Sequence, residues 1–266
     1  MDYQRVKRRV PEGLREITSI RGPGTVPTGR LAIGFGLAES VGEEVLRLGG
    51  QSVLLVTDRI LTDLGVADLL KRCLETAGLS AVVYDDVAPE PKLADVRTVQ
   101  EVVRSGGCDA VVGCGGGSVM DTAKVAAVTA TNSADIEEYL AGAPFDTSGL
   151  PLILMPTTSG TGSEVSPFIV FSDEERKLFQ RSPFLMSTVA LVDPLLTTTM
   201  PPAVTAATGL DALSHAVEGA QSAVNPFTQA MATECVGLVF NYLPRAFRDG
   251  EDLEARYYLS FASVIA

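Results

Sequence analysis

The sequence of 266 residues predicts an α/β domain with a parallel sheet, followed by an all-helical C-terminal segment. Two observations predict this class. Short strand patterns alternate with helix patterns over most of the chain, and the strands are apolar throughout, as in a parallel sheet covered by helices on both faces. Beyond residue 201 only helix patterns occur. We therefore divide the chain into an N-terminal arm (1–30), an α/β domain (31–196) and the start of a helical domain (197–266).

The elements follow in chain order. Residues 1–30 carry prolines at positions 11, 23 and 27, which predict an extended or irregular lead-in. Strand patterns cover residues 31–35, 52–57, 81–84, 109–113 and 152–155. Helix patterns cover residues 37–48, 63–77, 93–104 and 118–131 between the strands, and 203–219, 226–242 and 253–266 after them. The last helix pattern has no stop signal, so we expect the natural protein to continue beyond residue 266.

Composition excludes several classes of protein. The chain has 21 Lys and Arg against 33 Asp and Glu, and this net charge of −12 argues against a nucleic-acid partner. No apolar stretch reaches the length of about 18 residues that a membrane-spanning helix needs, and the first residues form no signal peptide. The four cysteines show no CxxC spacing, which predicts reduced thiols in a cytoplasmic protein.

The strongest local signal is a run of three glycines, Gly115, Gly116 and Gly117, between a predicted strand and a predicted helix. Glycine permits close approach of the backbone to a ligand and positive φ angles. The helix start at Ser118 and Val119 offers unpaired N–H groups and partial positive charge. A glycine run alone is more often a tight turn. At a strand-to-helix junction of a parallel sheet, however, it predicts a pyrophosphate site.

Two further segments follow strands of the same sheet. Thr157, Thr158 and Thr161 belong to a run of hydroxyl residues and glycines that can donate hydrogen bonds to phosphate or ribose oxygens. The alternative is an ordinary turn. Asp58 follows the strand at 52–57, where a carboxylate can accept both hydroxyls of an adenosine ribose and repel a 2′-phosphate. Its alternative is a helix N-cap or a solvated carboxylate.

The predicted helix at 203–219 carries Asp211 and the single histidine of the chain, His215. Because they are four residues apart, the two side chains leave the same helix face. A carboxylate and an imidazole in this arrangement can bind one divalent cation, and both Fe²⁺ and Zn²⁺ suit them. The alternative is a histidine at the core boundary. Two ligands do not hold a metal, since a site needs three or four protein donors.

Together these segments resemble the iron-dependent (group III) alcohol dehydrogenase family. The resemblance runs from about residue 31 to the end. In the α/β part it rests on Gly115, Gly116, Gly117 and Ser118 with Asp121 and Lys124, and on segment 156–164. Further along the chain it rests on Val192, Asp193 and Pro194, and on Pro201 and Pro202 leading to segment 208–218. It implies a dehydroquinate-synthase-like architecture, in which a nucleotide-binding α/β domain and an all-helical domain enclose the active site.

The resemblance also implies roles for single residues. Residues 115–119 would hold the pyrophosphate of NAD, residues 157, 158 and 161 would line the cofactor, and Asp58 would favour NAD over NADP. Lys177 lies near the position of a cofactor-contacting lysine. Asp211 and His215 match two of the family's four metal ligands. The segment 90–92, Glu-Pro-Lys, departs from the family's Asn-Pro-Thr, which puts a secondary cofactor contact in doubt.

The implied activity is hydride transfer between a nicotinamide and a small alcohol or aldehyde, with a metal as Lewis acid. The family's other two ligands are histidines that would follow residue 266, so we expect this chain alone to be inactive. Two rival hypotheses remain: a non-catalytic or partner-completed NAD-binding homologue, and a dehydroquinate-synthase-like lyase. The lyase needs Lys and Arg near the metal, where the sequence has few. We also expect a homodimer, formed by edge pairing of residues 31–35.

Overall fold

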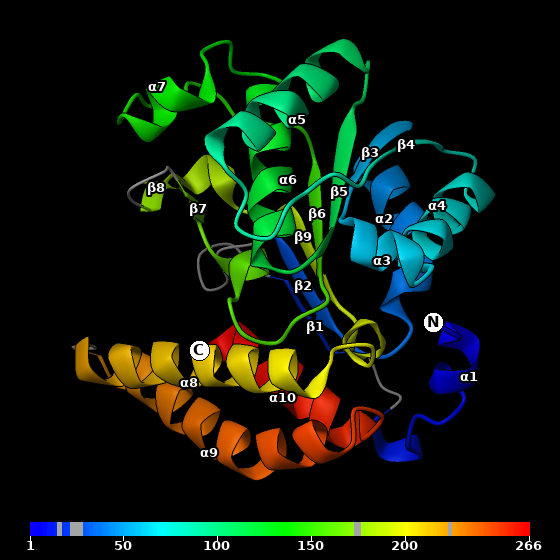
Figure 1. The fold of residues 1–266 in the computed structure, drawn as a ribbon, viewed down its shortest axis with the longest axis vertical. Coiled ribbons are helices and arrows are strands. Elements are labelled where there is room, and N and C mark those ends of the chain that lie inside the picture. Colours follow the sequence, from blue (N-terminus) through cyan, green and yellow to red (C-terminus); the bar gives the residue numbers. More distant parts are fainter. Residues whose placement is uncertain (15–17, 22–28, 173–176, 223–224) are drawn as a thin grey trace.

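The computed structural model describes residues 1–14, 18–21, 29–172, 177–222 and 225–266 (Figure 1). Its centre is a seven-stranded sheet in the order β1-β2-β9-β6-β5-β3-β4. The antiparallel strand at one edge is β1 (Thr18–Arg21). The parallel strands are β2 (Arg30–Ile33), β9 (Val189–Val192), β6 (Leu152–Pro156), β5 (Ala110–Gly115), β3 (Ser52–Val56) and β4 (Ser80–Tyr84). The predicted parallel α/β class is confirmed.

The central strands are apolar at nearly every position because helices cover both faces of the sheet (Figure 1). In β3, Val53 and Leu55 belong to the core beneath α2 (Val41–Arg47), α3 (Arg59–Asp63) and α4 (Val66–Thr76). The alternate residues Leu54 and Val56 belong to the opposite core, beneath α5 (Leu93–Ser105) and α6 (Gly117–Thr129). Successive side chains of a strand point to opposite faces, so each face needs its own apolar set.

Three helices form a second layer beside the sheet (Figure 1). They are α8 (Pro202–Ser222), α9 (Pro226–Arg248) and α10 (Leu253–Ile265), and they confirm the predicted all-helical segment. They share a separate apolar core, and Phe261 and Val264 of α10 also pack against β2 and β9. Within the described parts of the chain, no helix is long and apolar enough to span a bilayer.

The structure departs from the prediction at the N-terminal arm and in the middle of the chain. The arm is regular where it is described: it contains α1 (Tyr3–Lys7) and β1, while residues 15–17 and 22–28 lie outside the described part. The strands β7 (Phe168–Ser172), β8 (Lys177–Arg181) and β9 and the helix α7 (Ile136–Leu140) were not predicted. The expected edge pairing through residues 31–35 is wrong, because β2 is already paired on one side with β1 and on the other with β9.

Candidate functional site

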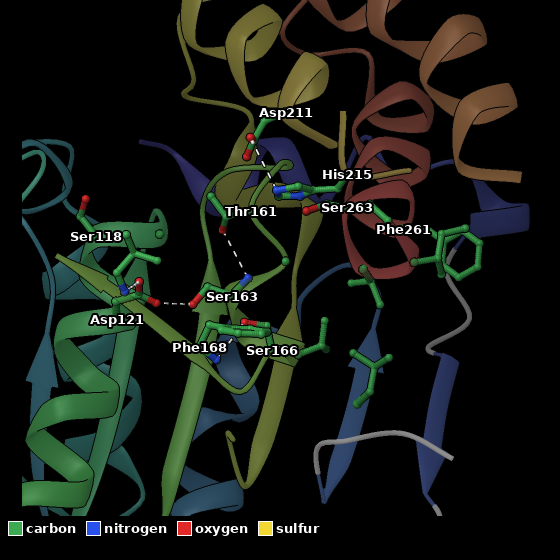
Figure 2. A pocket seen from close by; sticks show the side chains of 18 of the residues that line it. Ser118, Asp121, Thr161, Ser163, Ser166, Phe168, Asp211, His215, Phe261 and Ser263 are labelled. Atoms are coloured by element: carbon green, nitrogen blue, oxygen red, sulfur yellow. Dashed lines mark hydrogen bonds and ion pairs between the residues drawn. The ribbon is translucent and has the colours of Figure 1, made fainter. Parts of the chain in front are cut away.

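A cavity of about 950 Å³ lies between the α/β layer and the helical layer (Figure 2). Its walls come from the first turn of α6, the loop after β6, the hairpin β7–β8 and the helices α8 to α10. Half of the predicted site residues line it, namely Gly117, Ser118, Thr161, Lys177, Asp211 and His215. The others lie behind this lining or outside it, namely Asp58, Gly115, Gly116, Val119, Thr157 and Thr158.

The glycine run joins β5 to α6, as predicted, but its conformation corrects one expectation. None of these glycines is among those with positive φ, and Gly116 is an extended N-cap residue with φ −77° and ψ −172°. Their requirement is space. A Cβ on Gly115 would lie 2.5 Å from Cβ of Val119, and one on Gly117 would lie 3.0 Å from Cγ2 of Thr161.

Gly116 differs from its neighbours, since a Cβ there would meet only the side chain of Thr158 at ordinary contact distances, 3.5 Å from Cγ2 and 3.7 Å from Oγ1. Protein packing therefore explains Gly115 and Gly117 and leaves Gly116 unexplained. A ligand that approaches the backbone at the start of α6 would explain it. Val119 is only 2% exposed, so its side chain belongs to the core and only its backbone could contact such a ligand.

The loop after β6 lies against the glycine run. The N–H of Thr157 donates to the carbonyl of Gly115 at 3.0 Å, which brings the two predicted segments together. The Oγ1 of Thr158 is buried and has no hydrogen-bond partner among the described residues. A buried hydroxyl without a partner is costly, so a ligand oxygen at this junction would satisfy it. Oγ1 of Thr161 accepts from the N–H of Ser163 at 3.3 Å and faces the cavity (Figure 2).

Asp58 caps a helix, as the alternative interpretation of this residue predicted. It is the N-cap of α3, and its Oδ1 accepts from the N–H of Leu61 at 2.9 Å. The residue follows β3 at the same sheet edge as the glycine run, because parallel strands share their carboxyl edge. The contact to a ribose stays a prediction.

Asp211 and His215 extend from α8 toward Thr161 (Figure 2). Oδ1 of Asp211 and Nε2 of His215 lie 3.9 Å apart, and the two side chains are 43% and 42% exposed. Both groups leave one face of α8 and line the cavity, and their role as metal ligands stays a prediction. Within the described ranges, no cluster of three or more His, Cys, Asp or Glu could hold a metal ion. Asp211 and His215 can thus supply two of the ligands of a divalent cation, but not a complete site.

A buried polar cluster beneath the cavity was not predicted. Nζ of Lys124 donates to Oγ of Ser163 and to the carbonyl of Phe168, both at 2.7 Å. Ser163 donates in turn to Asp121, at 2.7 Å, and Asp121 also accepts from Val170 N–H at 2.8 Å. Burial raises the pKa of Asp121 and lowers that of Lys124, while their mutual attraction opposes both shifts. The cluster ties α6 to β7 and to the loop after β6.

Glu164 is the second unpredicted feature, and it is only 1% exposed. Its Oε2 is buried without a hydrogen-bond partner among the described residues, and burial raises its pKa to about 7. The sequence signal for these groups was present but ambiguous. Charged residues at 121, 124 and 164 stand in otherwise apolar or small-residue surroundings, yet burial of a charge depends on tertiary packing that a local pattern does not show.

Comparison with known proteins now decides the family. The family model described as iron-containing alcohol dehydrogenase matches residues 27–194, and the model for the C-terminal part of the Fe-containing alcohol dehydrogenase family matches residues 205–266. The chain belongs to the iron-containing alcohol dehydrogenase family. The resemblance that rests on the glycine run and the Asp–His pair is thereby confirmed.

Relatives in this family are similar over most of the chain. Choline dehydrogenase of Bacillus subtilis is 41% identical over 88% of this chain and 60% of its own length. NAD-dependent methanol dehydrogenase of Bacillus methanolicus is 35% identical over 88% of the chain and 62% of its own length. The crystal structure of sulfoacetaldehyde reductase from Bifidobacterium kashiwanohense in complex with NAD⁺ superposes with a TM-score of 0.85 and 35% identity, over 91% of this chain and 64% of that one. The chain thus spans about 60% of the length of the relatives it matches.

Proposed function

We propose that the protein is an NAD-linked, metal-dependent alcohol dehydrogenase or aldehyde reductase. The observation that carries the proposal is a single cavity lined by both the start of α6 and the Asp211–His215 pair. Hydride transfer requires a nicotinamide and a substrate oxygen to be held in one site. The printed names of two relatives, an NAD-dependent methanol dehydrogenase and a reductase in complex with NAD⁺, support the choice of NAD.

The backbone around Gly116 and Gly117 binds the diphosphate in this proposal, because Gly117 lines the cavity in the first turn of α6, where backbone N–H groups have no partner within the helix. The orphaned hydroxyl of Thr158 donates to a cofactor oxygen, and Lys177 supplies a cation from the hairpin wall. Asp58 selects NAD over NADP by accepting the ribose hydroxyls. Asp211 and His215 of α8 line the same cavity, so a nicotinamide bound there would lie within reach of a substrate at this pair.

Asp211 and His215 would hold a divalent cation, Fe²⁺ or Zn²⁺, with an anionic oxygen and a neutral imidazole nitrogen. When bound, this ion supplies Lewis-acid polarisation of the substrate oxygen. Further donors must come from outside the described residues, because two ligands do not close a site. We infer that the described chain alone is inactive.

The rival lyase would bind a substrate phosphate near the metal. Among the described lining residues, Lys177 is the only Lys or Arg, and it lies on the hairpin β8 rather than on α8. The cavity therefore suits a small alcohol or aldehyde better than a phosphorylated acid. The alternative is that a partner chain supplies the missing metal ligands, since Asp211 and His215 provide only two.

We further propose the domain division 1–30, 31–196 and 197–266, a cytoplasmic location and a homodimer. The described cysteines are all free, which suits a reducing compartment. The edge strands of the described sheet are β1 and β4, and β1 covers the side of β2 that was expected to be free, so we expect pairing of a second copy to use β1 in place of residues 31–35. No part of the proposal involves nucleic acid, since the net charge of −12 is unfavourable for it.

The test measures NADH formation with short alcohols, NAD⁺ and added Fe²⁺ or Zn²⁺ by a protein whose metal site has its full set of donors, either the full-length protein or its complex with a completing partner. The His215→Ala variant should lose turnover by at least about a hundredfold, since a polarising cation contributes several kcal/mol. Ser214→Ala is the matched control, because this neighbour on α8 is exposed and does not line the cavity. Equal turnover in the wild type and His215→Ala would refute the proposal.

A further inference from the structure

Glu90 has an unusual backbone among the residues that line the cavity. Its φ is 54°, and it is the only non-glycine residue with positive φ in the described ranges. Side-chain-bearing residues rarely adopt this conformation, and the following residue, Pro91, restricts it further. Strained positions of this kind persist only where neighbouring structure fixes them, and they cluster at functional sites.

Contacts on both sides fix this segment. The N–H of Glu90 donates to Oγ of Ser118, in the first turn of α6, at 3.3 Å. The carbonyl of Pro91 accepts from the N–H of Ser172, at the end of β7, also at 3.3 Å. Glu90 is thus fastened to the helix start that forms the proposed diphosphate site and to the hairpin that forms the adjoining wall.

The charge of Glu90 is unbalanced. Its side chain is exposed, and it makes no ion pair or hydrogen bond with any described residue. The other acidic lining residues are Asp121, which accepts three hydrogen bonds and pairs with Lys124, and Asp211, which lies on α8. Lys177 is the one Lys or Arg in the described lining. A diphosphate at the start of α6 would therefore have a carboxylate beside it where a neutral residue would serve binding better.

We infer that Glu90 sets the affinity for the dinucleotide, by placing a like charge beside the diphosphate. This inference rests on the proposed function. The backbone N–H of Glu90 orients Ser118, while its carboxylate weakens binding of the cofactor. Repulsion between solvent-exposed charges a few ångström apart corresponds to about a three- to tenfold change in the dissociation constant, and added salt screens it.

The test compares NADH binding by the wild type and Glu90→Gln, followed by the fluorescence of NADH in a titration. Glu90→Gln keeps the backbone strain and removes only the charge. We expect its dissociation constant to be about three- to tenfold lower at low ionic strength, with the difference disappearing at high salt. Glu90→Asn should show the same gain and a higher melting temperature, because Asn tolerates positive φ.

The matched control is Glu101→Gln, which removes an exposed carboxylate of α5 that does not line the cavity. It should leave NADH binding unchanged. The inference about Glu90 would be overturned, with the proposed function left standing, by any one of three results. These are an equal increase in NADH affinity in Glu101→Gln, an increase in Glu90→Gln that persists at high salt, or no increase in affinity in Glu90→Gln. If neither the wild type nor any variant binds NADH, the proposed function fails with it.

Discussion

At the residue scale, the three consecutive glycines have different physical reasons. Gly115 is required for strand-to-helix packing, because a Cβ would collide with the whole side chain of Val119. Gly116 has no such neighbour and a φ that any residue can adopt. The three glycines look equivalent in the sequence. In the structure, Gly115 is required by packing, whereas only a ligand would require Gly116.

This difference predicts opposite outcomes for two alanine variants. Gly115→Ala should lower the free energy of unfolding by about 1–3 kcal/mol through overpacking. Gly116→Ala should cost at most about 1 kcal/mol, the usual penalty of alanine at an N-cap, yet weaken NADH binding at least about tenfold by blocking the backbone. Urea unfolding and NADH titration of both variants measure the two effects. A Gly116→Ala protein that binds NADH normally would remove the backbone from the diphosphate site.

Glu164 is a buried carboxyl whose pKa in the folded protein, about 7, lies above its ordinary value of 4.5. The folded state therefore binds the proton more tightly than the unfolded state. The associated stability is fully present below the unfolded pKa and is lost as the pH rises through the folded pKa. Lys124 opposes this shift, since its positive charge favours the carboxylate.

Glu164→Gln mimics the protonated carboxyl at every pH. We expect it to match the wild type near pH 4 and to exceed it by up to about 3 kcal/mol near pH 8. Urea unfolding across this range measures the difference, with the exposed Glu101→Gln as a control that should show no comparable trend. If the free energies of unfolding of Glu164→Gln and the wild type differed by the same amount at every pH, the carboxyl would have the same pKa in the folded and unfolded states.

Sequence reasoning found the residues whose relation is local. Asp211 and His215 share a face because helix geometry fixes residues four apart, and the glycine run marks its own junction. Glu90, Glu164 and Lys124 acquire their properties from distant partners. Lys124, for example, contacts the carbonyl of Phe168, 44 positions away. No local period encodes such contacts, so these groups appeared only in the fold.

At the scale of elements, four of the five predicted strands, β2, β3, β5 and β6, are buried at nearly every position, and the fifth, β4, is only partly buried. The hairpin β7–β8 was missed because its apolar residues Phe168, Val170 and Phe179 are 41–68% exposed, against the usual pattern. They share the outer face, which borders the cavity. β9 was missed because it spans only Val189–Val192 and no long helix precedes it. For the hairpin and for β9, contacts with neighbouring elements rather than the local sequence determine that the segment forms a strand.

The helix α1 was missed because only Tyr3 and Val6 mark its buried face. It lies at the junction between the layers (Figure 1). The hydroxyl of Tyr3 donates to Asp193, a fully buried carboxylate that also accepts from backbone N–H groups at 36, 38 and 195. Arg5 and Arg9 pair with Glu251 in the turn between α9 and α10, but such exposed pairs contribute little. Tyr3 is the anchor of α1.

Tyr3→Phe should therefore lower the free energy of unfolding by about 1–3 kcal/mol, because Asp193 loses one donor while it stays buried. Hydrogen exchange in α1 should accelerate more than in the sheet. Tyr84→Phe is the matched control, since the hydroxyl of Tyr84 makes no hydrogen bond to the described residues, and it should change stability by less than about 0.5 kcal/mol. Equal effects of the two variants would show that the Tyr3 hydroxyl does not anchor the helix.

At the scale of the whole molecule, two layers contribute different halves of one site. The α/β layer holds the complete set of backbone and hydroxyl groups proposed for the dinucleotide, from α6 and the loop after β6. The helical layer contributes Asp211 and His215, and no third donor among the described residues lies with them. In the proposed function, cofactor binding and metal binding thus depend on different parts of the chain, and we expect them to be separable.

We expect a protein of residues 1–266 to bind NADH and to show no turnover with alcohols or aldehydes, even with excess Fe²⁺ or Zn²⁺. The physical reason is that two donors leave a divalent ion weakly held, whereas the diphosphate cradle needs no metal. NADH fluorescence reports the first property and the change in NADH absorbance reports the second. His215→Ala should leave NADH binding unchanged. Metal-stimulated turnover by this chain would show that its copies, or residues outside the described ranges, complete the ligand set.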